Sequence, residues 1–500
     1  MSQILDTLKA QLATWYDYGH ISSVLSWDQE TYMPEAAASE RADQLALIAE
    51  QMQAVLSSDE LKTTLSKWID LETGKIKIGA SIEEAAALKK TYKRWKDANC
   101  LPPDFVSRWA KTTSKAQFHW QSARTENNFS AFAPHLQTII DMIKERANYI
   151  DPKKNAYDLC LDEYEPGLSV ADCNQFFASL KAPLVDLLQE MTEKTASFPT
   201  LTGVKVPIQS QWEFGMTIAH DIGFDFKRGR QDKSTHPFTL DMGRNDVRIT
   251  TRLKEDDFTE AFSSTIHELG HALYQQGLPE AWQGIAVGES VSLGIHESQS
   301  RFWENMIAKR PSFWSHYFPQ LQSKCPEAFS NWTQNAFIQS LHHVKPGLIR
   351  VEADEISYCL HIMLRFDCER ALILDGLDVK DLPEFWKQKM QDYLGITPDT
   401  DANGVLQDVH WSAGLFGYFP TYAIGSVVAA QLWDALAHTH PKIEEEIAAG
   451  NFKTVLTWLQ ESIHQKGSLY EPKALVKNST GSDIDTAPFL QYLSQKYRAL

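Results

Sequence analysis

The sequence lacks the features that mark a membrane protein, a disulfide-rich secreted protein or a nucleic-acid-binding protein. It has no run of about 18 apolar residues, the length that a membrane-spanning helix needs. Its six cysteines are scattered without paired short spacings, so we expect reduced thiols. The formal net charge of −17 disfavours nucleic acids and acidic membranes as partners. We therefore expect a soluble, cytoplasmic protein with no nucleic-acid or membrane partner.

Helical periodicity dominates what is present. The chain has 500 residues, 43% of them hydrophobic, which is enough for a large buried core. Apolar residues recur at spacings of three and four over residues 40–56 and 134–150, and again from Glu352 to a stop at Gly376. These segments predict helices in a mainly α protein.

Two segments predict other structure. Apolar and polar residues alternate over residues 236–253 on either side of Gly243, a pattern typical of a β-hairpin. Residues 467–487 are rich in Ser, Lys, Gly and Asp and predict a surface loop. No long flexible linker divides the chain, so we predict one unit over residues 1–500, with two lobes around a groove.

The pentapeptide His267-Glu-Leu-Gly-His271 has the H-E-x-x-H pattern, in which two histidines bind one zinc ion and the glutamate acts as general base. Asp257 and Gly277 supply start and stop signals for a helix that carries it. The two histidines lie about 40° apart around this helix and roughly 150° from the centre of its apolar stripe. Both imidazoles should therefore face a cleft. The apolar stripe consists of Phe262, Ile266, Leu269 and Leu273.

A catalytic zinc ion needs a third protein ligand, and the extended pattern that ends in a third histidine is absent here. Glu289 and Glu297 are the candidates, because Glu280 follows the helix too closely. We favour Glu297, because it lies in a helical run and a rigid helix fixes a ligand better than a Gly-flanked loop. The adjacent His296 should be packed or hydrogen-bonded.

Several further motifs occur in order along the chain. They are Leu25-Ser-Trp-Asp-Gln-Glu-Thr-Tyr-Met-Pro, His236-Pro-Phe, Asp246-Val-Arg-Ile-Thr, His296-Glu-Ser-Gln, Ile349-Arg-Val-Glu-Ala-Asp354 and Gly404-Val-Leu-Gln-Asp-Val-His-Trp411. With these motifs, the chain resembles the carboxypeptidase Taq family of zinc metallocarboxypeptidases over nearly its whole length. The resemblance implies a saddle-like helical fold with a deep groove and an N-terminal helical lid, usually as a homodimer. It also implies removal of C-terminal residues from peptides.

The resemblance implies His267, His271 and Glu297 as ligands of zinc, with cobalt or another divalent ion accepted in related enzymes. Glu268 is then the general base, which takes a proton from water and passes it to the leaving amine. For the developing oxyanion we expect His410 and the pair Tyr418 and Tyr422, and the sequence does not say which tyrosine faces the zinc. The alternative for each tyrosine is a structural role, as a core aromatic side chain whose hydroxyl has a hydrogen-bond partner.

An exopeptidase needs a cation for the free carboxylate of its substrate, and a guanidinium binds it in a bidentate manner. Arg350 is our first choice for this cation, with Asp354 orienting it. The alternative is that Arg350 and Asp354 form only a structural i,i+4 ion pair on one helix. Arg248 is the second, although its alternation with Asp246 is more typical of a solvated strand face. The hairpin edge could align the substrate as an added strand. No charge cluster predicts which residue is removed, so we expect broad specificity.

Two alternatives differ in what the site does with a peptide. An endopeptidase or dipeptidyl carboxypeptidase would use the same zinc chemistry in an open-ended groove. A metal-stabilised scaffold that binds peptides without cutting them would leave Glu268 idle. An aminopeptidase is disfavoured, because no Gly-x-Met-Glu-Asn sequence is present to bind a free amine.

Overall fold

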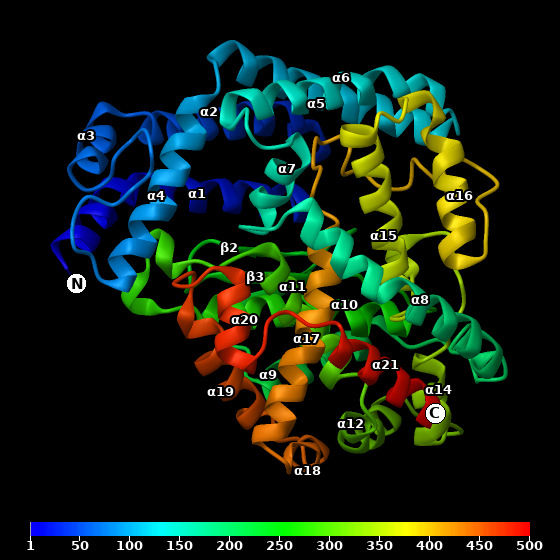
Figure 1. Cartoon of the computed structure of the whole chain (residues 1–500). Helices are drawn as coiled ribbons and strands as arrows, with labels where there is room; N and C mark the ends of the chain where they lie inside the picture. Colours follow the sequence, from blue (N-terminus) through cyan, green and yellow to red (C-terminus); the bar gives the residue numbers. More distant parts are fainter. Residues whose placement is uncertain (1) are drawn as a thin grey trace.

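Helices form most of the molecule, and the only sheet in the described part of the chain has three short strands (Figure 1). The structure is a computed structural model that describes residues 2–500. The α-helices of the first half are α1 (Gln3–Thr31), α2 (Ala38–Leu56), α3 (Asp59–Trp68), α4 (Ile82–Cys100), α5 (Pro103–Thr125), α6 (Phe129–Ile150), α7 (Ala156–Tyr164), α8 (Val170–Thr195) and α9 (Ile208–Ile222). Those of the second half are α10 (Phe258–Gly277), α11 (Leu293–Arg301), α12 (Pro311–Lys324), α13 (Pro326–Phe329), α14 (Gln334–Leu341), α15 (Ser357–Arg370), α16 (Leu382–Leu394), α17 (Pro420–Thr439), α18 (Ile443–Ala448), α19 (Lys453–Ser462), α20 (Pro472–Thr480) and α21 (Ala487–Ala499).

Shorter helical segments join these elements. They are η1 (Glu35–Ala37), η2 (Glu280–Trp282), η3 (Ala286–Gly288), η4 (Phe302–Ile307), η5 (Arg350–Glu352), η6 (Ala371–Asp375), η7 (Val379–Asp381) and η8 (His464–Lys466). Of all the helices in residues 2–500, none has the length and apolar character that crossing a membrane requires.

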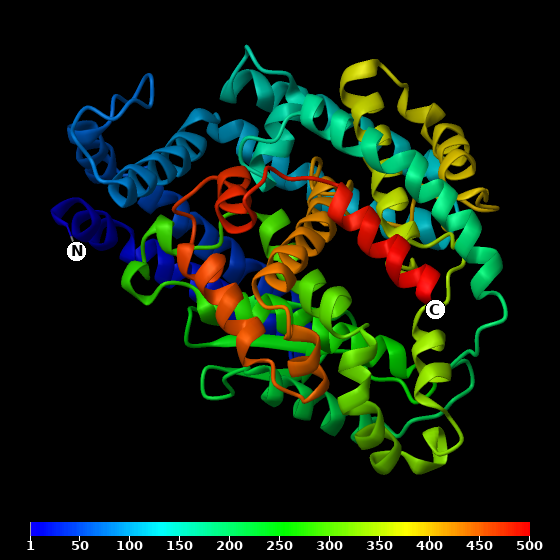
Figure 2. The ribbon, with the colours of Figure 1, turned by 60° about the horizontal axis from the view of Figure 1, so that its bottom comes forward.

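Two separate hydrophobic clusters hold the fold together. The larger one extends from α5 to α21. The smaller one joins α1, α3 and α4 through residues such as Leu8, Leu61 and Leu88. It reaches the rest of the molecule through Ile285 and Val287, which follow α10 in the chain. These N-terminal helices lie together at one end of the molecule, far from the C-terminus (Figures 1 and 2). Their role as a lid, and the deep groove beneath it, stay predictions.

The predicted hairpin is present, but it belongs to a larger sheet. Strands β2 (Thr239–Asp241) and β3 (Val247–Thr251) pair in antiparallel orientation, with Thr239 opposite Ile249. Strand β1 (Gly229–Lys233) pairs with β3 in parallel, and sequence analysis missed it. Its residues Gly-Arg-Gln-Asp-Lys include no apolar side chain, so no alternation marks it as a strand.

Two helix predictions and one loop prediction need correction. Helix α6 starts at Phe129, well before Pro134, because the side chain of Asn128 caps its first turn. The segment from Glu352 is not one helix: α15 begins at Ser357, after a turn capped by Asp354. The predicted loop 467–487 contains α20, in which Leu475 and Val476 are buried. Its polar composition reflects the solvated face of a short helix that packs on α17.

Two close backbone contacts bring the site elements together. Helix α10 begins and ends as predicted, with Asp257 as its N-cap, and all four residues of its apolar stripe are buried. A Cβ atom on Gly270 would lie 2.5 Å from the carbonyl oxygen of Gln299, so α10 and α11 pack backbone against backbone. A Cβ atom on Gly425 of α17 would lie 2.5 Å from Cγ of Glu297. Only glycines permit this spacing, which brings Glu297 close to the histidines of α10.

Candidate functional site

Three of the predicted residues converge at the contact between α10 and α11. One donor atom each from His267, His271 and Glu297 lies within 4.8 Å of the other two. The Nε2 atoms of both histidines are 3.5 Å from the same oxygen of Glu297, Oε2. Two imidazole nitrogens and one carboxylate oxygen form a donor set that suits a divalent ion such as zinc and leaves further positions open. These residues therefore fit such an ion.

The tautomer of His267 is set by Glu304, which sequence analysis missed. Nδ1 of His267 donates a hydrogen bond to Oε2 of Glu304 at 2.9 Å, because a carboxylate in this pair can only accept. The lone pair of Nε2 then faces Glu297. His271 contacts His296 between their Nδ1 atoms at 2.5 Å, and Gln275 lies 3.1 Å from the other nitrogen of His296. His296 is therefore hydrogen-bonded, as predicted.

Arg301 keeps the carboxylate of Glu297 ionised. Its Nε donates to Oε1 of Glu297 at 2.7 Å, and its Nη1 donates to Glu304 at 3.2 Å. Burial would raise the pKa of Glu297, but Arg301 and then His267 outweigh it and hold that pKa well below its usual range. The spacing of Glu297, Arg301 and Glu304, four and three residues apart, places them on one helix face and could have been noticed in the sequence.

Glu268 is buried and is fixed by the sheet. The hydroxyl of Thr239 on β2 lies 2.6 Å from Oε2 of Glu268 and can donate to it. Side chains alternate along strands, so Thr239 and its partner Ile249 share the face of the sheet that is turned to α10. The role of Glu268 as general base stays a prediction at this stage.

His410, Tyr418 and Tyr422 form one cluster at the start of α17. Nε2 of His410 lies 3.4 Å from the hydroxyl of Tyr422, and the rings of the two tyrosines are 5.3 Å apart. Nδ1 of His410 is buried and has no hydrogen-bond partner among residues 2–500. Burial lowers the pKa of His410 to about 4, so its ring is neutral near pH 7. Burial and then the charge of Glu297 raise the pKa of Tyr418.

Arg350 lies beside this cluster, with a partner that sequence analysis did not predict. Its guanidinium pairs with Asp408 and not with Asp354. Asp354 instead accepts hydrogen bonds from the backbone of Ile356 and Ser357, because the helix that would have aligned it with Arg350 begins later. The expected orienting role of Asp354 is therefore wrong. Asp408 lies in the Gln-Asp-Val-His-Trp segment, close in sequence to His410.

Arg350 connects to the candidate metal ligands through one tyrosine. Its Nη1 lies 3.4 Å from the hydroxyl of Tyr358 and can donate to it. The guanidinium of Arg301 lies 4.3 Å from the centre of the same ring, and Arg301 contacts Glu297. The guanidinium of Arg350 also lies 5.2 Å from the ring of Tyr422. Arg350 thus lies close to both the histidine–tyrosine cluster and the candidate metal ligands.

Arg248 lies on the other face of the sheet. It alternates with Val247 and Ile249, both fully buried, and its guanidinium pairs with Asp246 at 2.7 and 2.8 Å. It also stacks 4.6 Å from the ring of Trp27 on α1. The alternation predicted a solvated face, and this face is solvated in part: the side chain of Asp246 is 41% exposed, whereas Trp27 of α1 covers Arg248, which is 19% exposed.

Glu289, the other candidate for the third ligand, is engaged elsewhere. Its carboxylate accepts hydrogen bonds from Tyr16 and pairs with Arg94. These contacts anchor the N-terminal helices, and Glu289 is not part of the His267–His271–Glu297 group.

Comparison with known proteins places this site in a family. Residues 7–497 match the family described as carboxypeptidase Taq (M32) metallopeptidase. Carboxypeptidase 1 of Bacillus subtilis is 36% identical over 488 residues, which are 97% of this chain and 96% of that protein. The crystal structure of an M32 carboxypeptidase from Deinococcus radiodurans superposes with a TM-score of 0.95 at 34% identity, over 100% of this chain and 99% of that one. Metallocarboxypeptidase 1 of Trypanosoma cruzi gives a TM-score of 0.93 at 31% identity, over 99% of both chains.

The helical fold and these relatives define the protein as a metallocarboxypeptidase, a peptide hydrolase that depends on a divalent metal ion. This class of protein excludes the non-catalytic scaffold, an interpretation that the sequence alone left open. The chain belongs to the carboxypeptidase Taq (M32) family.

Proposed function

We propose that this carboxypeptidase uses zinc, held by His267, His271 and Glu297, to release C-terminal residues from peptides. The observation that carries the proposal is the approach of both Nε2 atoms to one oxygen of Glu297 at 3.5 Å. A bound zinc ion would supply Lewis-acid chemistry, polarising the scissile carbonyl and acidifying water. The His267 tautomer set by Glu304 supports this role, because it directs a lone pair towards the ion.

Glu268 takes a proton from the attacking water and passes it to the leaving amine. Its position next to His267 and His271 on α10 supports this role. The contact with Thr239 limits its rotation and keeps its carboxylate in one orientation. The other oxygen, Oε1, remains available for the proton.

Arg350 binds the free carboxylate of the substrate, which restricts cleavage to the C-terminal end. It is buried and lies near Tyr422 and Tyr358, whereas Arg248 is on the far face of the sheet. His410 and the tyrosines stabilise the developing oxyanion, and Nδ1 of His410, which has no hydrogen-bond partner among residues 2–500, is the ring nitrogen left for this contact. We assign Tyr418 to the side of the metal, since after burial the charge of Glu297 is the main cause that raises its pKa. We assign Tyr422 to the side of Arg350, whose guanidinium lies 5.2 Å from its ring.

The specificity, oligomeric state and partners of the enzyme are further parts of the proposal. We infer broad residue specificity, because no charged cluster among the site residues selects one side chain. We also infer a cytoplasmic homodimer that acts on peptides with a free C-terminus and binds neither nucleic acid nor membranes. The acidic net charge of −17 supports the last point.

One set of assays tests the proposal. The enzyme is stripped with a chelator, reloaded with zinc or cobalt, and given a peptide with a free or an amidated C-terminus. We expect single C-terminal residues to be released from the free peptide only, and only after reloading. Internal cleavage would support an endopeptidase. Release of two residues at a time would support a dipeptidyl carboxypeptidase. Recovery of activity with cobalt but not with zinc would show that zinc is not the metal used.

A further inference from the structure

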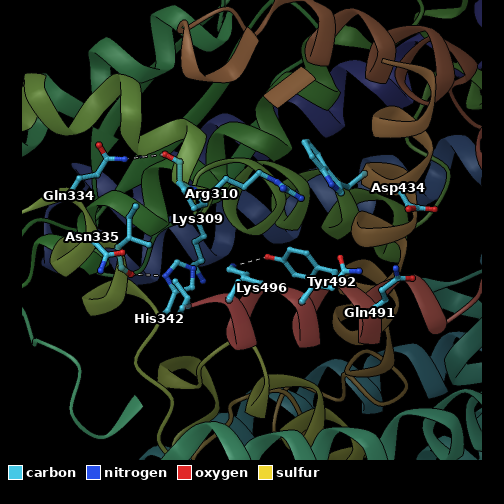
Figure 3. Close-up of a pocket in the computed structure, with 15 residues that line it drawn as sticks. Lys309, Arg310, Gln334, Asn335, His342, Asp434, Gln491, Tyr492 and Lys496 are labelled. Carbon is cyan, nitrogen blue, oxygen red and sulfur yellow. Dashed lines mark hydrogen bonds between the residues drawn. The ribbon is translucent and has the colours of Figure 1, made fainter. Parts of the chain in front are cut away.

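A pocket of about 640 Å³ lies where α21 crosses the ends of α14 and η4 (Figure 3). None of the residues that line it belongs to the candidate metal or substrate groups described above. Figure 3 shows Lys309, His342 and Lys496 together on one side of the pocket, with Asp434 and Gln491 on the other. This pocket is therefore separate from the candidate active site and has its own set of charged and polar side chains.

Two lysines of this pocket have donor capacity left over. Nζ of Lys496 donates to Glu355 and to the hydroxyl of Tyr492, both at 2.7 Å, which leaves one of its three N–H groups. Nζ of Lys309 forms an ion pair with Glu304 at 3.8 Å, too long for a hydrogen bond, so its N–H groups are not used by this carboxylate. Both ammonium groups can therefore donate to an anionic ligand.

His342 adds an acceptor without a partner. Its Nδ1 must donate to the carbonyl oxygen of Ile338, at 2.7 Å, because a carbonyl only accepts. Its Nε2 is consequently an acceptor, and it is buried with no partner in the described part of the chain, on a residue only 1% exposed. Burial, reinforced by the charge of Lys496, lowers the pKa of His342 to about 3, so the ring stays neutral. A buried acceptor of this kind calls for a neutral N–H or O–H donor.

The walls of the pocket are partly apolar. Ile338 and Trp433 line it, and the guanidinium of Arg310 lies over the Trp433 ring at 3.6 Å. Arg310 is already paired with Glu444, so it adds little net charge and few free donors. The ligand should thus carry one anionic group, an adjacent neutral donor and an apolar body. A free amino acid fits less well, since the ammonium group next to its carboxylate would lie close to the ammonium groups of Lys309 and Lys496.

The C-terminal residue of a peptide has all three properties. We propose that this pocket is a second site for a peptide C-terminus, with the carboxylate on Lys309 and Lys496 and the amide N–H on Nε2 of His342. The apolar side chain of that residue packs against Ile338 and Trp433. The site is separate from the one in which Arg350 binds the substrate, so it holds a peptide without cutting it.

A non-hydrolysable ligand tests this site on the zinc-loaded enzyme. N-methanesulfonyl-L-leucine keeps the carboxylate, an N–H donor and the apolar side chain, but has no peptide bond. We expect the native enzyme to bind two equivalents by equilibrium dialysis, one at each site. Methylation of its nitrogen should weaken binding at the pocket by about tenfold, the effect of one lost hydrogen bond to a buried acceptor.

Pocket variants assign the second equivalent. Asn335→Asp and Gln495→Glu each add a negative charge at an exposed position of the lining, where the fold is not at risk. Both should bind one equivalent and keep their zinc and their carboxypeptidase activity. Gln121→Glu, an exposed position on α5 outside the pocket, is the matched control and should bind two.

Three results would overturn the proposal. The first is a single equivalent in the native enzyme that Asn335→Asp and Gln495→Glu leave unchanged. The second is equal binding of the carboxamide analogue, which lacks the anionic group. The third is displacement of the second equivalent by inorganic phosphate at similar concentration, which would indicate a general anion site. None of these outcomes bears on the activity at the metal ligands, which is measured separately with a peptide substrate.

Discussion

The guanidinium of Arg350 is held by the carboxylate of Asp408, whose Oδ1 lies 2.9 Å from both Nε and Nη2. The second oxygen of Asp408 accepts a hydrogen bond from Arg365 at 2.7 Å. One carboxylate therefore faces two buried guanidinium groups, which leaves an excess positive charge next to the histidine–tyrosine cluster. A carboxylate from the substrate would balance this charge, and that supports Arg350 as the group that recognises the C-terminus.

Replacing Arg350 by Met should reduce kcat/KM for peptides with a free C-terminus by about 100-fold, the effect of losing charged hydrogen bonds worth about 3 kcal/mol. Zinc content should not change. Arg248→Met is the matched control, since Arg248 is likewise paired with one aspartate, and it should retain near-native kcat/KM. The reverse pattern in steady-state kinetics would assign the substrate carboxylate to Arg248.

Replacing Glu268 by Gln should lower kcat by about three orders of magnitude, because the amide cannot accept the proton. Metal analysis of the purified variant should give the native zinc content. Thr239→Val should cause a smaller fall in kcat, because it frees the carboxylate to rotate without removing it. Loss of zinc from Glu268→Gln would instead mean that Glu268 is a ligand.

Replacing Glu304 by Gln should weaken zinc binding by about 10- to 100-fold, since the neutral amide no longer supports the Nδ1–H of His267. Competition with a chromogenic chelator measures this affinity. Glu289→Gln is the control and should bind zinc with native affinity. Normal affinity in Glu304→Gln together with reduced affinity in Glu289→Gln would contradict the choice of Glu297 as the third ligand.

Glu369 is a buried carboxylate that fixes the loop carrying His410 and Tyr418. It accepts hydrogen bonds from Tyr157 at 2.7 Å, from the indole of Trp411 at 2.8 Å and from the backbone N–H of Gly417 at 2.8 Å. Glu369 forms no salt bridge within residues 2–500, and burial outweighs its hydrogen bonds and the charge of Arg365 and raises its pKa from 4.5 to about 7. The folded state therefore binds a proton that the unfolded state releases between these two values.

This proton should make the free energy of unfolding fall as pH rises from about 4.5 to about 7, by roughly 3 kcal/mol at 1.36 kcal/mol per pKa unit. The contribution is complete below pH 4.5 and is lost above pH 7. Urea unfolding at a series of pH values gives the free energy of unfolding as a function of pH. Between pH 4.5 and 7 this free energy should fall less steeply in Glu369→Gln than in the native enzyme. The exposed Glu384→Gln serves as control, and an unchanged slope in Glu369→Gln would refute the assignment.

The local geometry of the site could be predicted from the sequence because it depends on one element at a time. The spacing of His267 and His271, the caps of α10 and its apolar stripe all follow from the period of a helix. Glu297 was chosen for the same reason, since a helix holds a side chain in a fixed direction. The hairpin of β2 and β3 likewise follows from alternation around Gly243.

Contacts between distant elements were decided by the tertiary structure alone. Arg350 pairs with Asp408, 58 residues away, because the backbone between Arg350 and Asp354 is not one helix. Strand β1, the support of Glu268 by Thr239 and the pocket between α14, η4 and α21 also depend on how elements pack. Periodicity fixes the direction of a side chain within its own element, but it carries no information on which other element that side chain will meet.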